Sequence, residues 1–99
     1  MKPIDAKKYI REKVPLAHLL YQLSEEAAEL THASLKLARV LEGISPTPVT
    51  EEEATEKLIE EFNDVLLVAS VAECFPDYDI QANKLTRWYS RLKEAEKDE

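Results

Sequence analysis

Two pairs of acidic residues at helical spacing are the residues of this sequence best suited to chemistry. Glu26 and Glu29 form the first pair, and Glu61 and Asp64 form the second. Residues three apart on an α-helix share one face, so each pair can present two carboxylates side by side. Carboxylates brought together repel one another unless protons or a cation neutralise them. The pattern therefore predicts a site for a hard divalent ion, Mg²⁺ or alternatively Mn²⁺, and phosphate chemistry is the commonest use of such a site.

Basic residues that could hold the phosphate of a substrate lie further along the chain. Lys84, Arg87 and Arg91 are spaced three and four apart, so they share one face of a predicted helix. Arginine offers phosphate oxygens a planar fork, and lysine offers a compact charge. Lys36 and Arg39 extend the flank of the first acidic pair and could reach the same anion. The alternative, that the three later cations pair with acidic side chains, stays open.

Helices are the elements that would position these side chains. The sequence has one glycine, Gly43, and no strand-like alternation, so we expect an all-α fold: a bundle of about four helices in a single domain over residues 1–99. Thr50 and Glu53 form a capping box, and Ile44–Val49, with its two prolines, is the one clear loop. The predicted helices run from after Asp5 to about Lys13, over Leu16–Glu42, from Thr50 to about Cys74, and from Ile80, capped by Asp77 or Asp79, to about Lys93.

The apolar stripes of the two long helices determine where the acidic pairs lie. Glu26 is only about 60° from Leu23, taken as the centre of the first stripe, at 100° per residue. Glu61 and Asp64 border the second stripe, which contains Phe62. Antiparallel packing of the two helices, which a short connection favours, would bring both pairs face to face. Unpaired carboxylates at such a seam are unfavourable, so we expect a cation to neutralise them.

The length of the predicted helix Leu16–Glu42 favours an oligomer. At 1.5 Å per residue it spans roughly 40 Å, whereas a compact monomer of this size has a radius of gyration of only about 13 Å. The segment Val65–Ala72 is also apolar almost all round. Both features predict a bundle completed by a second chain, as a homo-dimer or homo-tetramer.

Composition excludes several classes of partner. A formal charge of −7 argues against binding a nucleic acid polymer, which requires a basic surface. The longest uncharged apolar run, Val65–Ala72, is too short to span a bilayer, and Met1–Val14 does not read as a signal peptide. A single cysteine, Cys74, cannot form an internal disulfide. We therefore expect a soluble cytoplasmic protein with no membrane partner.

Three strings in order along the chain resemble a known family. SEEAAEL, EEFNDVLLV and NKLTRWYSRL are similar to the signature of the all-α nucleoside triphosphate pyrophosphatases, the MazG-like superfamily: E-E-x-x-E on one helix, E-x-x-D on the next, and a later basic helix. The resemblance covers roughly Gln22 to Leu92. One departure is the 31 residues between Glu29 and Glu61, slightly more than is usual for the family.

The resemblance implies a reaction and a set of roles. The reaction splits a nucleoside triphosphate between its α- and β-phosphates, giving monophosphate and pyrophosphate, in a house-cleaning role toward surplus or non-standard dNTPs. Glu25 or Glu29 would be the general base. The implied Mg²⁺ ligands are Glu26, Glu29, Glu61 and Asp64. The implied phosphate contacts are Lys84 and Arg87, with Asn83 and Arg91. By position, Tyr21, Gln22 and Trp88 are candidates to contact the base.

Rival functions remain at this point. Glu29-x-x-His32 matches half of a di-iron motif, but no second Glu-x-x-His follows on the next helix. A non-enzymatic helical interaction module would use the carboxylates only as solubilising charge. Phosphoribosyl-ATP pyrophosphohydrolysis would keep the fold and change the substrate.

Overall fold

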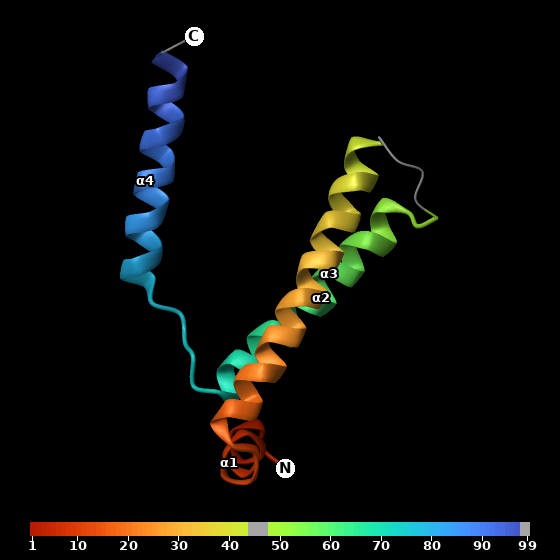
Figure 1. The fold of residues 1–99 in the computed structure, drawn as a ribbon, viewed down its shortest axis with the longest axis vertical. Helices are drawn as coiled ribbons and strands as arrows, with labels where there is room; N and C mark the ends of the chain where they lie inside the picture. The colour runs from red at the N-terminus through yellow and green to blue at the C-terminus, as the bar shows by residue number, and fades with distance from the viewer. Residues whose placement is uncertain (44–47, 98–99) are drawn as a thin grey trace.

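The computed structural model describes residues 1–43 and 48–97, and within these ranges all regular secondary structure is α-helical, without strands. Residues 44–47 of the predicted loop and the last two residues of the chain lie outside the described part. The all-α class predicted from the sequence is confirmed. The four helices, shown in Figure 1, are α1 (Pro3–Lys13), α2 (Leu16–Glu42), α3 (Glu51–Val71) and α4 (Tyr78–Lys97).

Local signals place several helix ends where the sequence predicts them. Gly43 closes α2 in the left-handed conformation, with φ of 65°, and its N–H donates to the Arg39 carbonyl at 3.0 Å. The Thr50 side-chain oxygen accepts a hydrogen bond from the Glu53 N–H at 3.1 Å, which is the N-cap half of the predicted capping box. Asp77 caps α4, because its Oδ1 accepts the N–H groups of the residues two and three positions later.

Four helix ends differ from the prediction. α1 begins at Pro3 instead of after Asp5, since proline suits the first turn of a helix. α3 ends at Val71 instead of near Cys74, because Glu73 takes a positive φ of 61° and stops the helix. The Cys74 N–H then donates to a carbonyl within α3 at 2.8 Å. α4 is longer than predicted at both ends.

α2 and α3 form the body of the molecule, an antiparallel helical pair (Figure 1). A small apolar cluster of Leu19, Val71 and Ala72, against which Val14 packs, joins the start of α2 to the end of α3. Small side chains, Ala33 and Ala54, are buried toward the other end of the pair. The core is therefore narrow and runs along the seam between two helices.

The buried face of α3 overlaps the predicted apolar stripe only in part: Ala72 is buried and Val65 is partly buried, as predicted, but the face is shifted toward Glu61. Phe62, placed in the apolar stripe from the sequence, is 49% exposed, whereas Glu61 is only 5% exposed. On α2, Leu20 and Leu41 are likewise exposed although both belong to the apolar pattern. The predicted leucine stripe of α2 is nevertheless buried in part, because Leu19 is buried and Leu23, Leu30 and Leu37 are partly buried.

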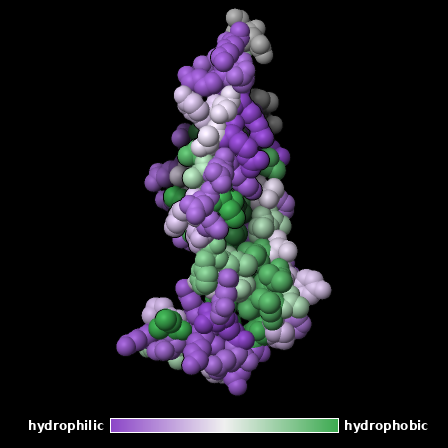
Figure 2. Space-filling model, turned by 90° about the vertical axis from the view of Figure 1, so that its left-hand side faces the viewer, coloured by the Kyte–Doolittle hydropathy of each residue, from purple (hydrophilic) through white to green (hydrophobic). Residues whose placement is uncertain are grey.

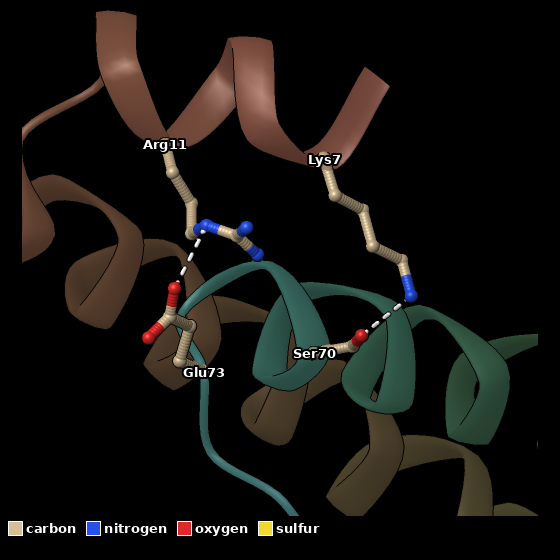
Figure 3. A network of polar contacts seen from close by, with 4 residues as sticks. All are labelled: Lys7, Arg11, Ser70 and Glu73. Carbon is tan, nitrogen blue, oxygen red and sulfur yellow. Dashed lines mark hydrogen bonds and ion pairs between the residues drawn. The ribbon is translucent and has the colours of Figure 1, made fainter. Parts of the chain in front are cut away.

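α1 crosses the end of α3 and is held by two polar contacts (Figure 3). Lys7 Nζ donates to Ser70 Oγ at 2.6 Å, and Arg11 Nε lies 2.9 Å from Glu73 Oε1. Both contacts fall at the point where the chain leaves α3. They join α1 to the C-terminal end of α3.

α4 extends away from the other three helices (Figure 1). None of its residues is buried. The radius of gyration is accordingly 18.0 Å, with extents of 55 × 39 × 24 Å. Among the described residues, no helix combines the length and apolar content needed to cross a membrane.

Candidate metal centre

Two glutamates occupy positions in the α2–α3 seam that are otherwise apolar. Glu26 lies midway along α2, and Glu61 lies midway along α3. The residues seven positions before and after each of them are all buried and apolar: Leu19, Ala33, Ala54 and Val68. Seven residues are two helical turns, so each glutamate continues the line of its buried neighbours. A carboxylate at such a position opposes folding unless it is neutralised.

Three carboxylates converge at this point of the seam. One carboxylate oxygen from each of Glu26, Glu61 and Asp64 lies within 4.8 Å of the other two. Glu61 is buried, and Glu26 and Asp64 are partly buried. The antiparallel packing of α2 and α3 thus brings together three of the four side chains that the sequence singles out. We call these three residues the acidic triad.

The fourth predicted ligand, Glu29, lies beside the triad and is exposed. It is one turn further along α2 than Glu26, on the side toward Lys57. Glu25, the other candidate general base, is also exposed on α2. Both carboxylates add negative charge around the triad, but neither belongs to the close group of oxygens.

The electrostatics of the triad are those of crowded like charges. Partial burial raises the pKa of Glu26, and neighbouring carboxylates raise it further. In decreasing order of effect, these neighbours are Asp64, Glu61, Glu29 and Glu25. The site therefore favours either a proton on Glu26 or a bound cation.

Lys57 is the one basic side chain paired with the triad in the described part of the chain. Its Nζ lies 2.7 Å from Glu61 Oε1. Its pKa is raised, first by the hydrogen bond to Glu61 and then by the charges of Glu60 and Glu61. One lysine offsets one of three negative charges, so a net negative charge remains. Sequence reasoning missed this residue, although its i,i+4 spacing to Glu61 is the signal that could have revealed it.

A basic pocket adjoins the triad. It has a volume of about 280 Å³ and lies between the C-terminal half of α2 and the first half of α3. Its lining is formed by Glu29, His32, Ala33, Leu35, Lys36, Arg39 and Lys57. Three of these side chains, Lys36, Arg39 and Lys57, are basic and only one is acidic. Lys36, predicted from the sequence to contact an anion, therefore lies beside two further cations, one of them from α3.

The other predicted substrate contacts lie elsewhere. Asn83, Lys84, Arg87 and Arg91 are exposed on α4, which extends away from the α2–α3 pair, so the structure does not place them at the triad of their own chain. Gln22 lines a different pocket, with apolar side chains of α1, α2 and α3.

The arrangement offers oxygen ligands to a hard cation and basic groups to an anion at one location. Mg²⁺ is usually held by one or two carboxylates together with substrate phosphates, so three clustered carboxylates beside a cationic pocket fit that ion. Comparisons with models of protein families, with curated proteins and with solved structures found no match to this chain.

Proposed function

We propose that this protein is an Mg²⁺-dependent nucleotide pyrophosphohydrolase that cleaves a (d)NTP between its α- and β-phosphates to (d)NMP and pyrophosphate. The observation that carries the proposal is the acidic triad at core positions of the α2–α3 seam, beside a pocket lined by Lys36, Arg39 and Lys57. The ordered motifs that resemble the MazG-like pyrophosphatases support the same reaction class. Control of the nucleotide pool, by removing surplus or non-standard dNTPs, is the role that the resemblance suggests.

The metal would be held by Glu26, Glu61 and Asp64, and Glu29, one helical turn further along α2, is a candidate fourth ligand. A divalent cation there, Mg²⁺ or alternatively Mn²⁺, would offset the negative charge of the triad that Lys57 does not neutralise. When bound, it would supply charge neutralisation at phosphate oxygens and a lowered pKa for a coordinated water. The triad thus supplies the carboxylates that a phosphoryl-transfer enzyme needs around its metal.

The remaining side chains bind and orient the substrate. Lys36, Arg39 and Lys57 would hold the negatively charged phosphates in the basic pocket, since guanidinium and ammonium groups donate well to phosphate oxygens. Glu25 and Glu29 are exposed carboxylates next to the triad, and either can take the proton of an attacking water. Removal of one phosphate-binding cation should therefore raise KM more than it lowers kcat.

The test is a pyrophosphate-release screen over standard and modified (d)NTPs with Mg²⁺. Glu61→Gln removes a triad carboxylate, and Glu60→Gln, a matched control, removes the same charge one residue away on an exposed face. We expect Glu61→Gln to lower turnover by at least about 100-fold, the upper end of what groups outside the ligand sphere contribute to a metal site. Equal pyrophosphate release by Glu61→Gln and the wild type contradicts the proposed site.

A non-enzymatic interaction module is the second candidate function. The observation that favours it is α4, which exposes large apolar side chains along its length. This candidate predicts no release of pyrophosphate and no response to Mg²⁺ or Mn²⁺. Turnover of phosphoribosyl-ATP alone, with no (d)NTP hydrolysed, would keep the site and change the substrate.

A further inference from the structure

Lys57 belongs to the acidic triad and to the basic pocket at once. Its Nζ lies 2.7 Å from Oε1 of Glu61, a member of the triad. The same side chain lines the basic pocket together with Lys36 and Arg39. The triad is the candidate metal site and the pocket is the candidate anion site, so Lys57 stands where the two sites meet.

The ion pair with Lys57 serves the buried carboxylate of Glu61 more than it serves the helix. The side chain of Glu61 is 7% exposed, whereas that of Lys57 is 53% exposed. A lysine four residues before a glutamate is the less favourable order of such a pair for helix stability. A buried carboxylate that loses its partner, by contrast, strongly destabilises a fold. Lys57 is therefore the counter-ion of Glu61.

The surroundings of the triad differ between the two ends of the α2–α3 pair. Figure 2 shows a continuous hydrophobic area in the lower part of the molecule, where α2 begins and α3 ends. Toward that end, the neighbours of the triad along the seam are the buried side chains of Leu19 and Val68. The basic pocket lies toward the other end of the pair. Lys57 thus reaches the triad from the side where the other basic side chains of the pocket lie.

Lys57 is the one basic residue of the pocket that a carboxylate holds in the described part of the chain. The ion pairs found there involve neither Lys36 nor Arg39. Those two side chains can bind an anion without giving up a partner. Lys57 is engaged at Glu61 and has only a longer contact, 3.8 Å, with the exposed carboxylate of Glu60. It can serve an anion in the pocket only by leaving Glu61.

We propose that Lys57 is an exchangeable counter-ion of the acidic triad, held at Glu61 in the metal-free protein and released into the basic pocket when a divalent cation binds. An ammonium group and a divalent cation at one carboxylate repel each other, so they compete for Glu61. Lys57 offsets one of the three charges of the triad and a divalent cation offsets two. The flexible four-carbon stem of lysine lets Nζ move while the helices stay in place.

The exchange couples the binding of metal to the binding of anion. This step rests on the proposed function, because it assumes that the triad binds a metal and that the pocket binds a phosphate. The released ammonium group joins Lys36 and Arg39, so the pocket has its third available cation only when the metal is bound. By linkage, each ligand then raises the affinity for the other by the same factor.

The first experiment titrates Mg²⁺ by calorimetry into the wild type and Lys57→Gln. Glutamine can still donate a hydrogen bond to Glu61 but carries no charge. We expect Lys57→Gln to bind Mg²⁺ roughly tenfold more tightly, the effect of removing one positive charge close to a divalent ion. A purely structural ion pair would give no such gain. Equal or weaker binding of Mg²⁺ by Lys57→Gln overturns the proposal.

Two further variants control this titration. Lys36→Gln removes the same charge from the same pocket but not from the triad, so its gain in Mg²⁺ affinity should be clearly smaller than that of Lys57→Gln. Lys57→Arg keeps the charge and should bind Mg²⁺ like the wild type. Unchanged helical content by circular dichroism shows that the variants fold. An equal gain in Lys36→Gln would mean that general charge, and not exchange at Glu61, sets the affinity, and it overturns the proposal.

The second experiment measures the affinity for inorganic phosphate with and without Mg²⁺. In the wild type, Mg²⁺ should raise this affinity at least about fivefold, a typical coupling between two sites. The gain should be smaller in Lys57→Gln, because no ammonium group is released into the pocket. Lys36→Gln should bind phosphate more weakly in both conditions and keep the wild-type gain. The same gain in Lys57→Gln as in the wild type overturns the release.

These measurements separate the exchange from the proposed function. A wild type that binds Mg²⁺ and hydrolyses (d)NTP, with no tighter Mg²⁺ binding by Lys57→Gln, refutes the exchange alone. Tighter Mg²⁺ binding by Lys57→Gln, in a protein that releases pyrophosphate from no (d)NTP, refutes the proposed function and supports the exchange. Absence of Mg²⁺ binding by the wild type refutes both.

Discussion

Mg²⁺ should stabilise this protein strongly, and Glu61→Gln should remove most of that effect. The acidic triad has three carboxylate oxygens within 4.8 Å of one another, and Lys57 offsets only one of the three charges. A divalent cation that binds the folded triad and not the unfolded chain stabilises the fold by mass action. The response to Mg²⁺ therefore reports directly on whether the triad is a metal site.

In the metal-free protein, Glu61→Gln has two opposing effects on the free energy of unfolding. Two like charges about 5 Å apart, such as those of Glu61 and Asp64, repel by roughly 1 kcal/mol in water and roughly 3 kcal/mol at an effective dielectric of 20. Asp64 is partly exposed, so the lower figure applies more closely. Relief of this repulsion is opposed by loss of the ion pair with Lys57. We therefore expect little change in the stability of the metal-free protein.

The stabilisation by bound Mg²⁺ is larger than the change that the substitution causes in the metal-free protein. Mg²⁺ at ten times its Kd stabilises the fold by about 1.4 kcal/mol, which raises the Tm of a domain of this size by about 6–11 °C. Loss of one ligand should weaken binding by at least about tenfold. At the same Mg²⁺ concentration the variant then gains at most about 0.4 kcal/mol, or roughly 3 °C.

The assay is thermal unfolding followed by circular dichroism, with and without Mg²⁺, at fixed protein concentration and ionic strength. Glu60→Gln is the control, because Glu60 is exposed, lies next to Glu61 and is not part of the triad. It should keep the wild-type shift. An equal rise in Tm for Glu61→Gln and the wild type, or no rise in the wild type, refutes the reasoning.

Three further predictions follow from the site and the helix ends. The pKa of Glu26 is raised in the folded state, so the native protein binds a proton more tightly than the unfolded chain does. The free energy of unfolding of the metal-free protein should therefore fall as the pH rises above about 4.3, the usual glutamate pKa. Urea titrations over this pH range should show the fall, and Glu26→Gln should make the pH dependence flatter. Lys36→Ala combined with Arg39→Ala should raise KM for the triphosphate and leave the Mg²⁺-induced Tm shift unchanged, since both side chains line the basic pocket and neither belongs to the triad; a lost Tm shift would contradict the separation of anion and metal sites. Thr50→Ala should cost about 1 kcal/mol of unfolding free energy in urea, by removal of the capping box; an unchanged midpoint would show that the cap contributes nothing.

The acidic pairs and their helices could be predicted from the sequence, but the site could be predicted only in part. Spacing along α2 and α3 identifies Glu26, Glu61 and Asp64, because residues three apart on a helix share a face whatever surrounds them. The same reasoning assigns Glu29 an equal role, and the structure places it outside the close group. Lys57 was not predicted, because a lysine four residues before a glutamate usually forms an ordinary ion pair on the helix surface.

The sequence by itself determined the local structure: an all-α chain, the extent of α2, the αL stop at Gly43 and the capping box at Thr50. These features depend mainly on interactions within a few residues, so they can be predicted without knowing how the helices pack. Only the tertiary structure decided which helical faces are buried. It places Glu61 in the seam and Phe62 outside, because the register of one helix against the other selects the face. It also turns the chain at Glu73, where φ is 61°, and leaves α4 without buried residues, and spacing along the chain encodes neither feature.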